Sequence, residues 1–170
     1  MNLTRLMGYV AVLVLGIVGA TVYGSRAAGT DPVVVERAME PARADVEYLT
    51  PFGAPTRPFS PAVRVGDVIY LSGQIGTDPG ANANAVVPGG IEAETRQTLN
   101  NIKRTVEAVG SSMDKVVKCT VMMADMKEWD RMNVVYREFF TPGKLPARSA
   151  FGTSGLALNA RVEIECIATR

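Results

Sequence analysis

Two charged side chains near the end of the chain have the types needed to hold and convert a small carboxylated molecule. Arg148 lies in the sequence PARS (146–149), and Glu163 lies in the alternating segment 161–168. A guanidinium can bind a carboxylate through two parallel hydrogen bonds, and it keeps its charge when water is removed. A half-buried carboxylate can orient water and exchange protons. Because each residue begins one of two neighbouring β segments, the sequence predicts that they hold such a molecule together.

Two other interpretations of these charges remain open at the level of the sequence. Taken alone, Arg148 and Glu163 are better explained as a salt bridge at an interface, which contributes little unless it is buried. Glu165 lies two residues beyond Glu163, so it points to the same side of a regular strand and competes for the carboxylate role.

The composition narrows the chemistry further. The chain has no histidine, which removes the usual proton shuttle at neutral pH, the Ser-His and Cys-His nucleophile pairs and the commonest zinc ligand. Lys and Arg number 18 against 17 for Asp and Glu, so no overall field attracts a polyanion. We therefore expect no nucleic-acid partner, and acid or base catalysis by carboxylate, lysine, tyrosine or water.

The two cysteines, Cys119 and Cys166, each lie inside an alternating apolar run. Their spacing matches neither a zinc site nor a redox CxxC pair. Burial as small apolar side chains is favoured over a catalytic thiol, because no histidine is present to activate either one. A disulfide between them requires adjacent strands and an oxidising compartment, and the sequence leaves that question open.

The N-terminus differs from the rest of the chain. Residues 6–23 carry no charge, follow Arg5, and are typical of a signal peptide or of a short membrane anchor. We assign 1–27 to this signal peptide or anchor, with possible cleavage after Ala27, and 28–50 to a linker. The protein is then expected to be exported, periplasmic or secreted, or anchored in the inner membrane through 6–23.

The remaining 51–170 is long enough for one packed domain. Short apolar runs and turn residues predict two hairpin strands, a loop, a helix that ends near Gly110, a strand, a second helix capped by Asp125, and two closing strands. Their approximate ranges are, in order, 62–65, 68–72, 76–90, 91–109, 116–123, 126–140, 147–153 and 161–168. The second helix has an apolar stripe that we assign to the core: Trp129, Met132, Val135, Tyr136 and Phe139.

This order of elements predicts an α+β fold in which two helices pack on one face of a mixed sheet. Two helices cannot cover both faces, and the strands carry apolar residues on both. We therefore expect other subunits to cover the second face.

Several segments of this domain resemble the RidA/YjgF family of reactive-intermediate deaminases. The resemblance extends from about Pro58 to Ala168. Its segments are FSPA (59–62), LSGQ (71–74), PGGI (88–91), TRQTLNN (95–101), MNVVY (132–136), PARS (146–149) and VEIE (162–165).

The resemblance implies a homotrimer of chorismate-mutase-like subunits with ligand clefts between neighbours. It implies hydrolysis of imines and enamines such as 2-aminoacrylate to a keto acid and ammonia, with no metal and no organic cofactor. Arg148 would bind the substrate carboxylate, and Glu163 would orient water and transfer protons. Substrate-binding positions in the family correspond here to Ser72, Gly73, Asn133 and Phe59.

The chain departs from the best-characterised deaminases at two positions. Phe59 stands where they carry a tyrosine, and Ala150 stands where many carry a cysteine. These departures favour an alternative, a non-catalytic trimeric module that binds a small metabolite or a protein, whereas Arg148 and Glu163 favour the deaminase. An RNA-cleaving activity has been attached to relatives, but the near-neutral charge and the expected export argue against it.

Overall fold

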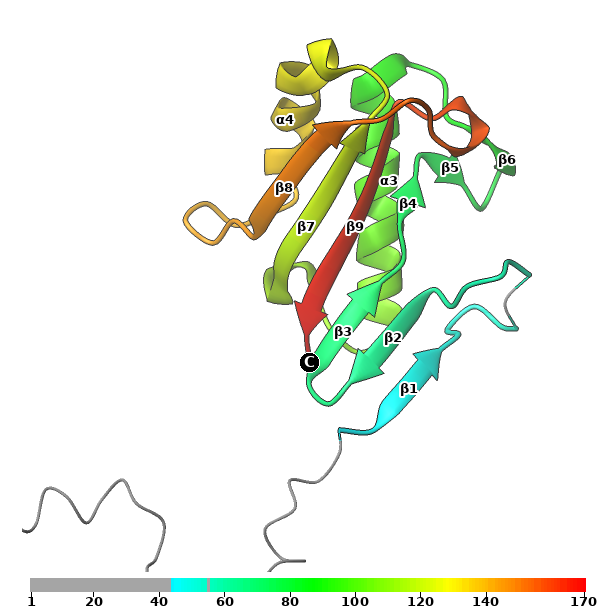
Figure 1. Cartoon of the computed structure of the whole chain (residues 1–170), viewed down its shortest axis with the longest axis vertical. Helices are drawn as coiled ribbons and strands as arrows, with labels where there is room; N and C mark the ends of the chain where they lie inside the picture. The colour runs from blue at the N-terminus through cyan, green and yellow to red at the C-terminus, as the bar shows by residue number, and fades with distance from the viewer. Residues whose placement is uncertain (1–43, 55) are drawn as a thin grey trace, which may run out of the picture. The chain divides into compact units, whose positions relative to one another are not determined.

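A mixed β-sheet of seven strands lies at the centre of the residues that the computed structural model describes, 44–54 and 56–170 (Figure 1). Its strands are β1 (Val46–Leu49), β2 (Ala62–Val65), β3 (Val68–Leu71), β4 (Gln74–Ile75), β7 (Val116–Met123), β8 (Ala147–Gly152) and β9 (Val162–Thr169). The order across the sheet is β1-β2-β3-β9-β7-β8, and β4 also pairs with β9. Strands β7 and β8 run parallel to each other, which makes the sheet mixed.

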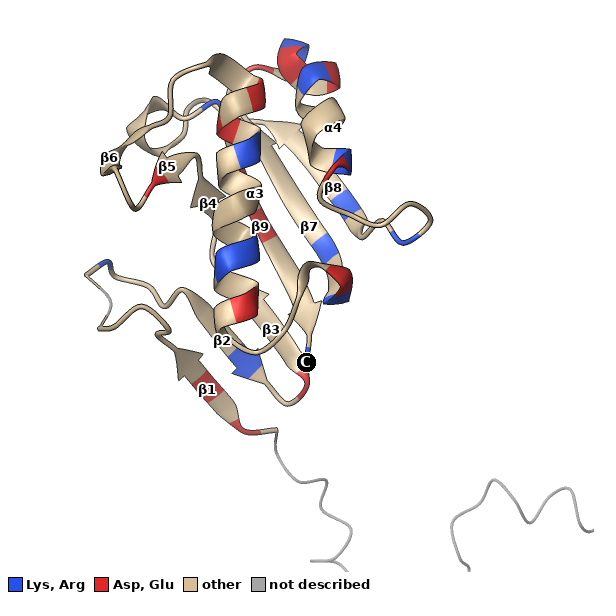
Figure 2. Ribbon diagram, turned by 180° about the vertical axis from the view of Figure 1, so that it is seen from behind, with Lys and Arg blue, Asp and Glu red and all other residues tan. Residues whose placement is uncertain are grey.

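Two helices, α3 (Gly90–Ala108) and α4 (Trp129–Arg137), lie on the same face of this sheet. Figure 2 views the molecule from that face, with both helices in front of the strands and the charged positions of α3 marked. The turn before α4 begins as predicted, because the side chain of Asp125 accepts a hydrogen bond of 2.9 Å from the backbone N–H of Lys127. The prediction of an α+β fold with both helices on one face is confirmed.

The hydrophobic core fills the space between the helices and the sheet. Helix α3 contributes side chains that repeat every three or four residues, and the central strands contribute side chains at alternate positions. The fully buried members are Ile69, Ile91, Leu99, Ile102, Val106, Val121, Met123, Met132, Val162 and Ile164. The alternation on β9 matters most for the site, because burial of Val162 and Ile164 turns Glu163 to the opposite face.

The two cysteines lie directly opposite each other on β7 and β9 and form a disulfide. Cys119 and Cys166 are both buried, as expected from their apolar surroundings. The sequence left open whether these cysteines are bonded, and their adjacent strands allow the bond. It closes a loop of 47 residues.

Three elements differ from the sequence-based expectation. Strand β1 lies within 28–50, where we expected only a linker, and it pairs with β2 in antiparallel register. The expected loop 76–90 contains a two-stranded hairpin, β5 (Thr77–Asp78) and β6 (Asn82–Val86). Strand β7 lies between β8 and β9, so the strands that carry Arg148 and Glu163 are not neighbours in the sheet.

The sheet face opposite the helices has no covering layer among the described residues. Phe151 of β8, Met122 of β7 and Glu163 of β9 stand side by side across this face. Phe151 and Tyr70 are each 48% exposed on it. An aromatic surface of this kind is typical of a contact with another protein chain.

The apolar run 6–23 lies outside the described residues, as does the proposed cleavage position after Ala27. Within the described part of the chain, no helix has the length and apolar character that crossing a membrane requires.

Candidate functional site

Arg148 lies on β8, which forms one edge of the sheet, and it faces the helix-covered side. It is in register with the buried Cys119 of β7, which sets the side to which it points. Its Nη1 donates a hydrogen bond of 2.8 Å to Oδ1 of Asn133 on α4. Asn133 is 8% exposed, so the amide is buried against the arginine and does not point into solvent.

Two aromatic rings of α4 flank the same guanidinium. The Arg148 Cζ lies 4.8 Å from the ring centroid of Trp129 and 4.6 Å from that of Tyr136. A cation over the face of an aromatic ring is attracted by the ring quadrupole. A hollow of about 420 Å³ opens beside these side chains, and Leu145 and Pro146 complete part of its wall. No described carboxylate forms an ion pair with Arg148, so its charge is free to bind an anion.

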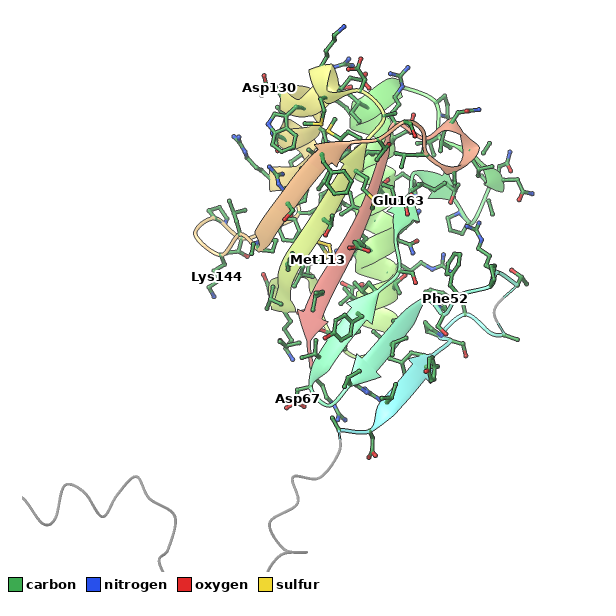
Figure 3. All side chains as sticks on the ribbon, in the orientation of Figure 1. Phe52, Asp67, Met113, Asp130, Lys144 and Glu163 are labelled. Carbon is green, nitrogen blue, oxygen red and sulfur yellow. A yellow bond between two sulfur atoms is a disulfide. The ribbon has the colours of Figure 1, made fainter. Side chains whose placement is uncertain are left out.

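Glu163 projects from β9 beside β4, on the face that the helices do not cover (Figure 3). Gly73 lies against it: a Cβ added to Gly73 would come 2.1 Å from Oε1 of Glu163. The glycine therefore provides the space that the carboxylate occupies. Burial raises the pKa of Glu163, and the negative charge of Glu165 raises it further. A raised pKa brings the carboxylate closer to the range in which a general base works near neutral pH.

Ser72 directly precedes Gly73 in the chain, and Phe59 lies in the loop before β2. The Ser72 hydroxyl donates a hydrogen bond of 2.6 Å to the backbone carbonyl of Ser60, which ties the loop before β2 to the end of β3. Phe59, 46% exposed, and Gly73 both line a hollow of about 320 Å³ between that loop and α3. Of the predicted substrate-binding residues, Gly73 thus lies against Glu163 and Asn133 contacts Arg148, whereas Phe59 lines the hollow beside α3 and Ser72 bonds to Ser60.

The two groups are not brought together within one protomer. Arg148 faces the helix-covered side at the β8 edge, whereas Glu163 faces the open side, and β7 separates their strands. The prediction that the strands carrying Arg148 and Glu163 are neighbours is wrong, because β7 lies between them. A salt bridge between them within a single protomer is excluded by the same geometry.

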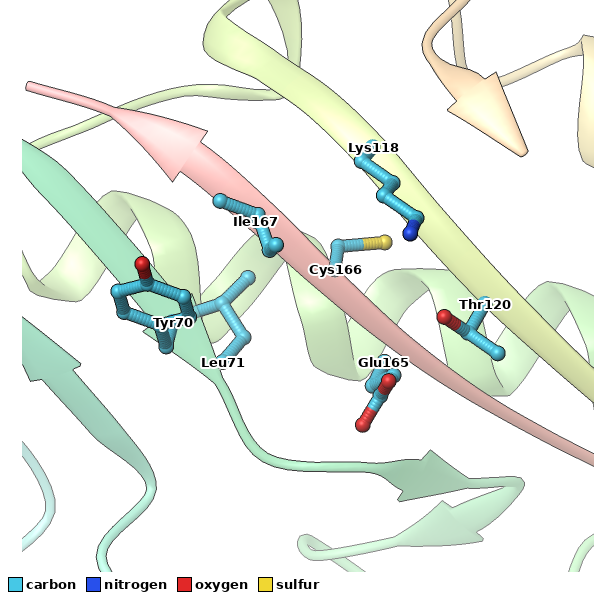
Figure 4. Close-up of a pocket in the computed structure, with 7 residues that line it drawn as sticks. All are labelled: Tyr70, Leu71, Lys118, Thr120, Glu165, Cys166 and Ile167. Carbon is cyan, nitrogen blue, oxygen red and sulfur yellow. The ribbon is translucent and has the colours of Figure 1, made fainter. Parts of the chain in front are cut away.

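Glu165, the competing carboxylate, shares the open face with Glu163 and is more exposed. It lines a shallow hollow of about 150 Å³ together with Tyr70, Lys118, Thr120 and Ile167 (Figure 4). Glu163 is the better candidate for proton transfer, because it is less exposed and lies against Gly73.

The aromatic partners of Arg148 were missed in the sequence, where Trp129 and Tyr136 were assigned only to the core. A signal was present, because Trp129, Asn133 and Tyr136 are spaced at i, i+4 and i+7 and therefore lie on one helical face. Metal binding has no comparable cluster: within 44–54 and 56–170, no group of three or more His, Cys, Asp or Glu side chains is placed to hold an ion.

Comparisons with known proteins agree with this fold. Residues 52–170 match the family model described as Endoribonuclease L-PSP. The 2-iminobutanoate/2-iminopropanoate deaminase of Mus musculus is 42% identical over 113 residues, which cover 66% of this chain and 82% of the mouse protein.

Solved structures show the same relationship. A Yersinia pestis protein of the conserved Rid family aligns with a TM-score of 0.68 and 32% identity, over 74% of this chain and all of the Yersinia chain. The YjgF gene product of E. coli aligns with a TM-score of 0.62 and 34% identity, over 69% of this chain and 91% of the E. coli chain. The expected RidA-like fold is therefore confirmed, and the chain belongs to the Endoribonuclease L-PSP family, also called RidA/YjgF.

Proposed function

We propose that the protein hydrolyses reactive imines and enamines of small 2-amino acids, such as 2-aminoacrylate, to the keto acid and ammonia. The observation that carries the proposal is the half-buried guanidinium of Arg148, which has an amide partner in Asn133 and no acidic partner among the described residues. Such a cation favours a carboxylate ligand. The deaminase name of relatives at about 40% identity supports the same substrate class.

Glu163 takes the proton-transfer role in this proposal. An enamine first becomes the imine by gaining a proton at its terminal carbon and losing one from its nitrogen. Water then adds to the carbon of the C=N bond, while Glu163 accepts a proton from that water and passes it to the nitrogen. Glu163 then moves the hydroxyl proton of the resulting carbinolamine to its nitrogen, the C–N bond breaks with its electron pair going to that nitrogen, and the keto acid and ammonia leave. The raised pKa of Glu163 suits a group that must both accept and return a proton.

The complete site forms between two copies of the chain. Arg148 lies at an unpaired sheet edge of the described fold, where it can reach a second copy, and Glu163 lies on the uncovered face, where a second copy can pack. The exposed Phe151 and Tyr70 on that face support such packing. We propose a homotrimer in which each cleft receives Arg148 from one subunit and Glu163 from the next.

The first experiment measures ammonia release from freshly generated 2-aminoacrylate by the wild type and by Arg148→Ala. We expect a wild-type rate well above the uncatalysed rate and a variant rate close to it. If the wild type and the variant both match the uncatalysed rate while a keto acid still binds at Arg148, the alternative of a non-catalytic binding module replaces the deaminase. Phe59 and Ala150 are the features that favour that alternative.

The second experiment tests the shared site. Arg148→Ala and Glu163→Gln are each expected to be inactive alone, since every cleft then lacks one group. Unfolding and refolding the two variants together in equal amounts gives mixed trimers in which about one quarter of the clefts have both native groups. Recovery of roughly that fraction of the wild-type activity supports the shared site, and a mixture as inactive as its components rejects it.

Export remains part of the proposal. The disulfide between Cys119 and Cys166 supports it, because disulfides persist in oxidising compartments and are rare in the cytosol. Mass spectrometry of the mature N-terminus, together with cell fractionation, tests both the location and the processing of 1–27.

A further inference from the structure

The surroundings of Arg148 go beyond the role of a substrate anchor. A long charged side chain at the edge of a sheet normally samples many rotamers, and ordering it on binding costs conformational entropy. Here three side chains of α4 contact its guanidinium. They are Trp129, Asn133 and Tyr136, which follow one another at intervals of about one helical turn on a single face.

The geometry points to a division of tasks among these three residues. A guanidinium has five N–H donors, and the attraction of its charge to the face of an aromatic ring requires no acceptor atom. Trp129 and Tyr136 contact the cation through their ring faces, and Asn133 accepts from Nη1 alone. The other N–H groups have no partner among the described residues, and the hollow beside Arg148 gives a ligand access to them.

We propose that Trp129 and Tyr136 are positioning residues, whose rings hold the Arg148 guanidinium in the orientation that binds the substrate carboxylate. The inference rests on the proposed function, because it assumes that Arg148 binds a carboxylate. It adds a reason why an aromatic residue stands at both positions. The rings act through Arg148 and are not themselves catalytic.

The ring of Tyr136, and not its hydroxyl, is the part that this inference needs. Tyr136 is only 4% exposed, its hydroxyl has no hydrogen-bond partner within the described residues, and burial raises its pKa to about 12. A phenol of this kind stays neutral at physiological pH and leaves the ring face as the contact with the cation. Tyr136→Phe retains the ring and removes the hydroxyl, which makes it a matched control.

Trp129 provides a direct readout because it is the single tryptophan of the chain. Binding of a keto acid to Arg148 changes the environment of a ring 4.8 Å away. Titration of the wild type with 2-oxobutanoate is therefore expected to change the tryptophan fluorescence to saturation, whereas Arg148→Ala gives no saturable change. A wild type without any saturable response overturns the inference.

The role itself is tested by calorimetric titration of 2-oxobutanoate into full-length variants. Trp129→Leu retains an apolar side chain against the core but removes the ring, and we expect its affinity to fall about tenfold. Trp129→Phe restores a ring face and is expected to bind within about threefold of the wild type, as is Tyr136→Phe. In turnover, Trp129→Leu should raise KM with little change in kcat, as expected when an interaction acts equally on substrate and transition state.

Two results of the calorimetric titrations would also overturn the inference. One is a Trp129→Leu protein that binds 2-oxobutanoate as tightly as the wild type. The other is a Tyr136→Phe protein that loses as much affinity as Trp129→Leu, since the hydroxyl would then be the important group. If Trp129→Leu fails to fold, Tyr136→Leu takes its place: it is expected to lose about tenfold in affinity, whereas unchanged binding overturns the inference, and Tyr136→Phe is its control.

These outcomes are distinct from failure of the proposed function. Binding is measured with the keto acid and needs no turnover. A protein that binds 2-oxobutanoate through the aromatic contacts but releases no ammonia fails as a deaminase and retains this inference. A protein that releases ammonia but binds 2-oxobutanoate equally well without the Trp129 ring supports the proposed function and overturns this inference.

Discussion

The carboxylate of Glu163 occupies the space that a side chain at Gly73 would need, with Oε1 only 2.1 Å from the position of an added Cβ. Because Gly73 has no positive φ, its own backbone would accept other residues. The contact with Glu163 is therefore what restricts the position. A small change at Gly73 should consequently act on the carboxylate before it acts on the fold.

We predict that Gly73→Ala lowers the rate of ammonia release by about 100-fold, because it displaces the proton-transfer group by an ångström or more. The rate is measured with 2-aminoacrylate, and the fold is checked by circular dichroism. Gly155→Ala is the matched control, since an added Cβ at Gly155 meets no atom within 4 Å. An active Gly73→Ala protein would show that the position of the Glu163 carboxylate is not critical.

The rise of kcat/KM on the acid side of its pH profile should depend on the negative charge of Glu165. This charge adds to the burial that raises the pKa of Glu163. In Glu165→Gln the pKa of Glu163 is therefore lower, and the rise of kcat/KM with pH is expected to move to lower pH. Glu107→Gln, an exposed residue on α3, is the control and should leave the profile in place. A shift to higher pH would contradict the assignment of Glu163 as the base.

The raised pKa of Glu163 also affects stability. The folded protein holds this proton more tightly than the unfolded chain does, so the favourable contribution is present at acid pH and is lost as pH rises through the folded-state pKa. Glu163→Gln removes the titration. We predict that the variant gains stability relative to the wild type as the pH rises from the ordinary pKa of a glutamate, about 4, through the raised pKa of the folded state.

That comparison uses urea unfolding at a fixed protein concentration, because an oligomer gains stability with concentration. A difference between variant and wild type that stays constant across this pH range would show that the pKa of Glu163 is the same in the folded and unfolded states.

The disulfide should contribute substantially to stability. It closes a loop of 47 residues between β7 and β9. Replacing both Cys119 and Cys166 by Ala is predicted to lower the free energy of unfolding by about 4 kcal/mol. A reductant should destabilise the wild type to a similar extent and leave the double variant unchanged in the same urea titration. A reductant effect on the double variant would point to another cause.

The parts of the fold that sequence predicted well are those with strong burial. Val162, Ile164, Cys166 and Ala168 alternate without interruption, and this pattern placed β9 and turned Glu163 away from the core. The apolar repeat of α3 and its end at Gly110 were equally clear. In these elements, one periodicity fits the residues and the alternative does not.

The missed elements lack such a pattern. Strand β1 exposes Val46 and Tyr48 by 52% and 72%, so no alternation of buried residues marks it, and its pairing with β2 is a contact between distant segments of the chain. Hairpin β5–β6 is short, and its residues 82–85 are exposed. Neither could be recognised from hydrophobic periodicity.

The position of Arg148 could not be predicted for a related reason. Strand β8 has no fully buried residue, so its sequence does not show which face Arg148 takes. Its parallel pairing with β7 follows from the crossover through α4, which composition does not reveal. The residues of the candidate site were identifiable one by one, whereas their separation onto two faces required the three-dimensional structure.

The separation of Arg148 and Glu163 by β7 has a consequence for how activity would depend on the amount of protein present. In the proposed homotrimer, a lone protomer would carry one half of each of two different clefts and complete neither. Dilution below the level at which subunits dissociate would then abolish turnover in intact, folded chains. Specific activity would rise steeply across that threshold and become constant above it, unlike that of an enzyme whose site lies within a single subunit.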